Sequence, residues 1–332
     1  MRAEAADAKP GRRAAWALRI AISGGLLVFL FLRIDIREIV AALGNISALL
    51  FGLGCLLFLC GQVINTERWR TLLVMALGSA PTRRFLLRLV FVGMFFNFFL
   101  PSTVGGDVVR AEMARKRVGG RTDAYLSIVI ARLLAFMAVL LIGLAASLFA
   151  WQRLGWFDRD LALSTLVFLL PIVAIFVATG TGAIDRLTRV KWLPMARLGG
   201  ALGVVRSFRA YTSSRSGLAW VFVLSVLAQF AGNVFVVWAL GEALGIPVPL
   251  SFHMVAIPLI TLITLLPISI NGIGVREGGF VYFYAKVGVA GDAAVALSLA
   301  YTLVLAVFSM LGGLSLLLGR GGNKVDQVRE GP

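Results

Sequence analysis

The chain has 332 residues, of which 59% are apolar and only 14% are charged. Soluble globular proteins carry about 25% charged residues, so this composition excludes a soluble enzyme or binding module and indicates a polytopic helical membrane protein. The net charge is +16, but most basic residues stand beside apolar stretches, where they orient a membrane chain and meet anionic lipid; no nucleic-acid partner is expected.

The N-terminal segment 1–13 is polar and has no small-residue cleavage site after a short apolar core, so we interpret it as a cytoplasmic tail. Full membrane spans are predicted at 14–32 and 47–64, each long enough to cross about 30 Å of hydrocarbon. The two cysteines, Cys55 and Cys60, both lie in the second of these spans and are interpreted as buried free thiols.

A shorter apolar arm, 85–100, ends in Leu-Pro and is followed by "STVGGDVVRAEMARKRVGGR". That stretch is too charged to cross hydrocarbon, so the arm either spans the membrane alone or enters it partway and returns. A second arm, 250–266, also ends in Leu-Pro. Full spans are further predicted at 124–150, 161–181, 217–240 and 293–318, and the polar segment 319–332 is interpreted as a second cytoplasmic tail.

Positive charges distinguish the two possibilities for the arms. If both arms are re-entrant hairpins and the N-terminus is cytoplasmic, the inside segments carry 24 Lys and Arg and the outside segments carry 6. If the first arm spanned the membrane, the basic stretches 110–123 and 182–216 would lie outside, against the positive-inside rule. We therefore predict two hairpins, with 182–216 as an amphipathic segment on the cytoplasmic surface.

The two breaks resemble each other. "LPSTVGGDVVR" from Leu100 and "LPISINGIGVR" from Leu266 share five of eleven residues without a gap, 166 positions apart. Each half of the chain then consists of two spans, a re-entrant hairpin and a third span, so the second half must enter the membrane upside down. The predicted fold is all-α: one transmembrane domain, 14–318, built from inverted halves at about 14–150 and 161–318, with six full spans and two hairpins, about eight membrane helices in all.

These breaks suggest a site for an anionic group. Proline ends the entering half-helix, the glycines allow a tight turn, and the returning half-helix begins near Gly106 or Gly272 with unpaired N–H groups. Arg110 and Arg276 follow about one turn later, where a guanidinium can bind phosphate with two hydrogen bonds. Arg110 could instead be one more cytoplasmic anchor beside Arg115, and Asp107 could be a helix N-cap.

Other polar residues of the apolar runs are also candidates. Glu277 could bind substrate or pair with Arg276, and Arg132 lies about two turns inside its span. The group "INTERWR", which contains Arg68, is expected mainly to anchor the end of the second span at the interface. The candidate substrate-binding residues are Arg110, Arg276, Glu277, Asp107, Gly105, Gly106, Asn271, Gly272, Gly274, Arg132 and Arg68; no catalytic residue, metal ligand or cofactor is predicted.

The motifs "NFFLPSTVGGDVVRA" and "LPISINGIGVREGGFVYFY" resemble the lysylphosphatidylglycerol synthase transmembrane-region family of flippase-like integral membrane proteins. The resemblance covers almost the whole chain and implies lipid translocation or the handling of lipid-linked glycans. Only fourteen residues follow the last span, so the cytosolic lysyl-transfer domain of the best-known members has no counterpart, and lysyl transfer by this chain is not expected.

The sequence therefore predicts a flippase of the cytoplasmic membrane, with both termini cytoplasmic, that moves a phospholipid or an isoprenoid-linked lipid. An integral membrane glycosyl- or lipid-headgroup transferase is the alternative, as is a non-catalytic subunit that presents lipid to a partner enzyme. Asp107, Glu112 and Glu277 could serve as acid–base carboxylates, but no metal cluster or nucleotide loop accompanies them, so an enzyme is not predicted.

Overall fold

The computed structural model describes residues 36–99, 105–118, 120–154, 214–265 and 272–319, together with Leu170 and Tyr211. In these residues, four helices are long and apolar enough to cross a membrane: Ala48–Leu77, Arg121–Ala145, Arg215–Ala243 and Gly291–Leu318. They confirm four of the predicted spans. The other two, 14–32 and 161–181, lie outside the described residues apart from Leu170, and so does most of the basic segment 182–216.

All of the regular elements in the described ranges are helices. The first half of the chain contributes α2 (Ile36–Gly44), α3 (Ala48–Leu77), α4 (Arg83–Phe99), α5 (Gly105–Ala114) and α6 (Arg121–Leu154). The second half contributes α10 (Arg215–Gln229), the π-helical turn η2 (Phe230–Val234), α11 (Phe235–Ala243), α12 (Leu250–Leu265), α13 (Val275–Ala285) and α14 (Gly291–Gly319).

The two short apolar helices agree with the predicted arms. Helix α4 begins and ends within two residues of 85–100, and α12 ends one residue before the predicted end at 266. Each is followed in the chain by a second short helix, α5 or α13. Proline lacks an N–H and restricts the residue before it, which is why both ends were visible in the sequence.

One boundary differs from the prediction. Helix α3 does not end near residue 64 but continues to Leu77, where Gly78 adopts the left-handed conformation (φ 72°) and donates its N–H to the carbonyl of Val74. The charged group "INTERWR" therefore lies inside a helix and not at the end of a span. Neighbouring helices cover this part of α3, since Arg68 and Trp69 are both buried.

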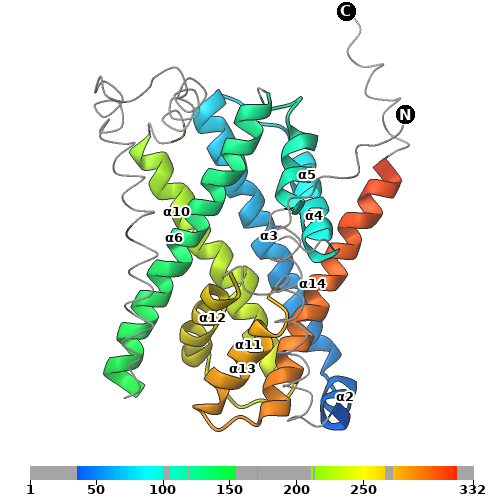
Figure 1. The fold of residues 1–332 in the computed structure, drawn as a ribbon, viewed down its shortest axis with the longest axis vertical. Coiled ribbons are helices and arrows are strands. Elements are labelled where there is room, and N and C mark those ends of the chain that lie inside the picture. Colours follow the sequence, from blue (N-terminus) through cyan, green and yellow to red (C-terminus); the bar gives the residue numbers. More distant parts are fainter. Residues whose placement is uncertain are drawn as a thin grey trace, which may run out of the picture.

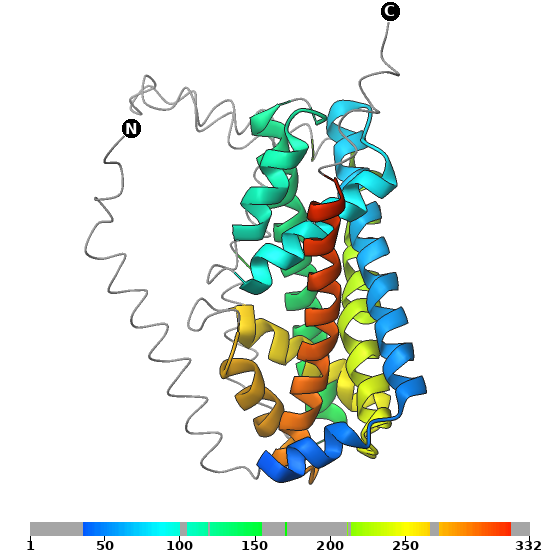
Figure 2. The ribbon, with the colours of Figure 1, turned by 90° about the vertical axis from the view of Figure 1, so that its right-hand side faces the viewer.

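The long helices run along the long axis of the molecule, and the short pairs lie toward its opposite ends. Figures 1 and 2 show the α4–α5 pair in the upper half and the α12–α13 pair in the lower half. Helix α4 packs against α14, whereas α12 packs against α6, so each short pair rests on a long helix from the other half of the chain. The largest core cluster joins α3, α11, α12, α13 and α14 through side chains such as Phe58, Leu240, Phe280 and Phe308.

Candidate functional site

A cavity of about 220 Å³ lies between α3, α4, α5 and α6. Seven of its lining residues are polar or charged: Gln62, Asn65 and Arg68 from α3, Asn97 from α4, Asp107 and Arg110 from α5, and Arg132 from α6. Three arginines therefore share this lining with one carboxylate. The structure brings together four of the predicted site residues, from three different helices, in one place.

Asp107 connects two of these arginines. Its Oδ2 lies 3.2 Å from Nη1 of Arg132, and its Oδ1 lies 3.9 Å from Nη1 of Arg110. The residue stands in the first turn of α5, so the ion pair with Arg132 fastens α5 to α6. Among the described lining residues, one carboxylate faces three guanidinium groups, so this part of the lining has a formal excess of two positive charges. Uncompensated positive charge on partly buried side chains costs free energy of folding unless an anion binds beside it.

Arg110 is held by an aromatic ring. Its guanidinium carbon lies 4.1 Å from the ring centroid of Trp69, within the range of a cation–π contact. Trp69 is itself fully buried and donates its indole N–H to Oγ of Ser127, 3.0 Å away. The Arg110 side chain is only 11% exposed, against 46% for Arg115. Arg110 therefore does not lie at the surface as a cytoplasmic anchor would.

Arg68 occupies the α3 side of the cavity. It is 8% exposed, and it donates to Oδ1 of Asn65 (2.5 Å) and to Oγ of Ser225 on α10 (3.4 Å). Gln62, Asn65 and Arg68 recur every three residues, which places them along one face of the helix. This three-residue spacing of polar side chains is the sequence signal for the cavity face of α3, and Arg68 lies in the cavity lining and not at the interface predicted for it.

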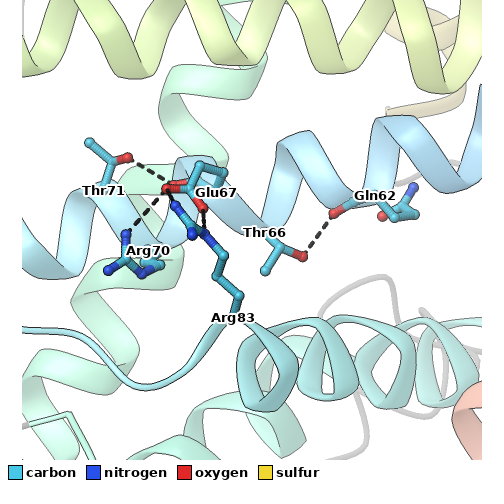
Figure 3. Close-up of polar contacts among 6 residues, drawn as sticks. All are labelled: Gln62, Thr66, Glu67, Arg70, Thr71 and Arg83. Atoms are coloured by element: carbon cyan, nitrogen blue, oxygen red, sulfur yellow. Dashed lines mark hydrogen bonds and ion pairs between the residues drawn. The ribbon is translucent and has the colours of Figure 1, made fainter.

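The other face of α3 carries a separate ionic network (Figure 3). Glu67 accepts hydrogen bonds from Nε (2.7 Å) and Nη2 (3.1 Å) of Arg83 and from Nη1 of Arg70 (3.2 Å). Thr66 donates its hydroxyl to the backbone carbonyl of Gln62 (2.8 Å). The network joins α3 to the first residue of α4. Glu67 and Arg70 are thus structural, whereas Arg68 on the same helix belongs to the cavity.

The glycines of the first hairpin have a packing role. A Cβ atom on Gly106 would overlap the carbonyl oxygen of Gly93 on α4, so the two backbones touch here. The N–H of Gly106 donates to Oδ1 of Asn97 (2.8 Å). The sequence predicted that the first N–H groups of α5, which begins at Gly105, face the cavity unpaired. For Gly106 this prediction is wrong, because Oδ1 of Asn97 on α4 accepts the hydrogen bond from its N–H.

A second, smaller cavity lies beside the other hairpin. Its volume is about 110 Å³, and Arg276, Tyr301, Asn233, Thr261 and Thr264 are among its lining residues. Arg276 donates from Nη1 to Oγ1 of Thr302 (2.9 Å), and its guanidinium carbon lies 5.9 Å from the ring centroid of Tyr301. Tyr301 in turn donates its hydroxyl to Oδ1 of Asn233. Each of the two cavities therefore contains an arginine beside an aromatic ring: Arg110 beside Trp69 in the first, and Arg276 beside Tyr301 in the second.

Glu277 serves the fold of this second hairpin. It is 5% exposed, accepts from the N–H of Gly274 at 2.6 Å, and accepts from the hydroxyl of Ser298 on α14 at 3.2 Å. Both carboxylate oxygens are thereby used to cap α13 and fasten it to α14. Gly272 (φ 76°) and Gly274 (φ 82°) adopt positive φ angles that favour glycine. Asn271 lies outside the described residues.

The profile of the lysylphosphatidylglycerol synthase TM region matches residues 16–313. The chain belongs to this family. A UPF0104 membrane protein from Methanothermobacter thermautotrophicus (strain Delta H) is 26% identical over 292 residues, which cover 79% of this chain and 80% of the relative. No solved structure matches the chain significantly. Membership of the lysylphosphatidylglycerol synthase TM region family, together with the four long apolar helices of the described ranges, establishes a multi-pass membrane protein.

Proposed function

We propose that this protein is a flippase that moves the headgroup of an anionic lipid across the cytoplasmic membrane. The observation that carries the proposal is the convergence of Arg68, Arg110 and Arg132 on one cavity, whose described lining holds one carboxylate, Asp107. The surplus positive charge favours an anion, and guanidinium groups bind phosphate oxygens in pairs. The name of the family refers to a phosphate-bearing lipid, which supports a phospholipid or a polyprenyl phosphate as substrate.

The arrangement of the two hairpins supports alternating access. The α4–α5 and α12–α13 pairs lie toward opposite ends of the molecule, and each rests on a long helix of the opposite half. We interpret this as the inverted repeat that the two Leu-Pro breaks predict. In this scheme the Arg110 cavity receives the headgroup from the cytoplasmic side, and the Arg276 cavity lies on the outward path.

A transferase is less well supported, because the available carboxylates are already engaged. Asp107 pairs with Arg132 and Arg110, and Glu277 caps α13. Glu112 accepts from the Tyr125 hydroxyl at 2.9 Å and pairs with Arg121 at 3.0 Å. A general acid or base needs a carboxyl that can exchange a proton with substrate. A partner enzyme that makes or uses the lipid remains compatible with transport.

Lipid translocation in reconstituted vesicles tests this function. Purified protein is incorporated into vesicles with fluorescent phosphatidylglycerol, fluorescent polyprenyl phosphate or fluorescent phosphatidylcholine, and a membrane-impermeant quencher reports movement between leaflets. We expect faster exchange of an anionic probe than of the zwitterionic one. Exchange of both anionic probes at the rate of protein-free vesicles would exclude the proposed function for these lipid classes.

A further inference from the structure

An apolar groove lies on the other side of the first hairpin from the arginine cavity. It has a volume of about 820 Å³ and runs between α4, α5 and α14. Phe95 and Phe96 of α4 and Met310 and Leu314 of α14 are among the side chains that form its walls. Within the described lining the one charged side chain is that of Arg88. The groove is large enough for a hydrocarbon chain, in the range of lipid and drug sites.

This groove is distinct from the arginine cavity. On α5, Val109 and Met113 line the groove, whereas Asp107 and Arg110 line the cavity. The hairpin is therefore a wall with a charged face and an apolar face. A ligand in the groove contacts none of the three arginines of the cavity.

Arg88 gives the groove a polar end. Its Nη2 donates to the backbone carbonyl of Ser315 at 2.7 Å, which fixes the guanidinium against α14. Its buried Nε has no hydrogen-bond partner among the described residues. Arg88 precedes Phe95 by about two helical turns, or roughly 10 Å along α4. Polar and apolar parts of the lining thus follow each other along the helix.

We propose that the groove holds a phosphate-bearing lipid from the leaflet in which α4 begins. The phosphate lies at Arg88, the one charged side chain of the described lining, and a hydrocarbon chain extends past Phe95 and Phe96 toward Met310. A half-buried guanidinium at the end of an apolar groove favours an anionic group, and phosphate oxygens are good acceptors for it. The order of charge and apolar surface matches one lipid standing upright in its leaflet. This inference does not rest on the proposed transport activity.

Photo-crosslinking in reconstituted vesicles tests this binding site. The probes are phosphatidylglycerol and diacylglycerol that carry the same diazirine on one acyl chain, and mass spectrometry locates the labelled peptides. We expect phosphatidylglycerol to label the peptides of Met113 and Met310 at least threefold more than diacylglycerol does. Arg88→Gln should remove most of this preference. Arg84→Gln, at an exposed arginine outside the groove on the same helix, should leave it unchanged.

Arg88→Gln also removes the hydrogen bond from Arg88 to the carbonyl of Ser315, so a second variant that leaves this bond in place is needed. Val109→Trp fills the groove while Arg88 stays, and it should lower labelling by phosphatidylglycerol at least threefold, in protein that elutes as the wild type does. Equal labelling by both lipids, or labelling that survives Arg88→Gln, would show ordinary annular lipid and overturn the proposal. A disulfide between Met310→Cys and a cysteine placed in segment 14–32 would overturn it too, because the chain itself would then fill the groove.

Discussion

Gly61 of α3 and Gly232 of the π-helical turn η2 lie backbone to backbone. A Cβ atom on Gly61 would overlap both the Cα and the N of Gly232. The contact joins the first half of the chain to the second near the middle of two membrane-spanning segments. Close crossings of membrane helices commonly depend on such small residues, because apolar side chains gain little by leaving lipid.

Substitution at this crossing should destabilise the protein. Gly61→Val forces two backbones apart, and overpacking of this kind costs about 1–3 kcal/mol. The expected result is a lower midpoint of thermal unfolding in detergent than for the wild type. Gly52→Val is the matched control, since a Cβ at Gly52, also on α3, meets no atom within 4 Å. If the two variants unfold at the same temperature, the crossing does not determine stability.

Arg110→Ala should reduce transport much more than Arg115→Ala does. Hydrogen bonds to charged groups contribute about 1.5–3 kcal/mol, which corresponds to a loss of roughly 10- to 100-fold in headgroup affinity. Arg115 lies on the same segment but is 46% exposed and pairs with Glu112, so its removal should change little. The measurement is lipid exchange in vesicles as a function of probe concentration, with thermal stability in parallel. Equal effects of both substitutions would indicate that Arg110 contributes only to the general positive charge of the surface and does not bind the headgroup.

Arg276 should be sensitive to the shape of the cation as well as to its charge. Arg276→Lys keeps the charge but loses the fork that binds two oxygens. Its exchange rate should therefore fall between those of the wild type and Arg276→Ala. Lys286→Ala, an exposed cation at the end of α13, serves as the control. A wild-type rate for Arg276→Ala, or a loss explained by unfolding alone, would place the outward site elsewhere.

Gly106→Ala should separate α4 from α5. The added methyl group overlaps the carbonyl oxygen of Gly93 and the side chain of Asn97. We expect a loss of stability of about 1–3 kcal/mol and a weaker response of transport to lipid concentration, because Arg110 shifts with its helix. Gly278→Ala in α13 is the control, since a Cβ there meets nothing within 4 Å. Tolerance of Gly106→Ala would mean that the hairpin is looser than its contacts indicate.

The two hairpins should be reached from opposite sides of the membrane. Lys116 follows α5 and Val287 follows α13, both are exposed, and the two hairpins lie toward opposite ends of the molecule. Single cysteines at these positions, with Cys55 and Cys60 replaced by serine, report the topology. An impermeant thiol reagent added to inverted vesicles should label Lys116→Cys, and added to right-side-out vesicles it should label Val287→Cys. Labelling of both from one side contradicts the inverted repeat.

The features that sequence predicted best are those marked by proline and by charge. Pro101 and Pro267 follow the last turns of α4 and α12, so both helix ends lie within two residues of their predicted positions. Arg110 and Arg276, each nine residues after a proline, lie in α5 and α13, the short helices that follow α4 and α12 in the chain. These signals are local, and a single chain is enough to read them.

The features that sequence did not predict depend on which helices face each other. Arg68, which faces the cavity, and Arg70, which pairs with Glu67 outside it, are distinguished in the sequence only by the polar residues three and six positions before Arg68. The sequence does not distinguish a capping role of Glu277 from a role in substrate binding. The contact that distinguishes them is the hydrogen bond from the hydroxyl of Ser298 on α14 to the Glu277 carboxylate. The π-helical turn at Gly232 has no sequence signature of its own, and it lies where Gly232 packs against Gly61 of α3.

The packing of α4 on α14 has a consequence for how the protein is made. Helix α14 is synthesised after every other described helix, yet it forms one side of the first hairpin and touches its backbone where Gly312 meets the carbonyl of Phe91. Until α14 has been synthesised, the side of α4 that packs against it is covered only by lipid or by a chaperone. The last step of folding is then the packing of α14 against α4. Premature termination just before α14 should yield a chain that inserts but is cleared by membrane proteases.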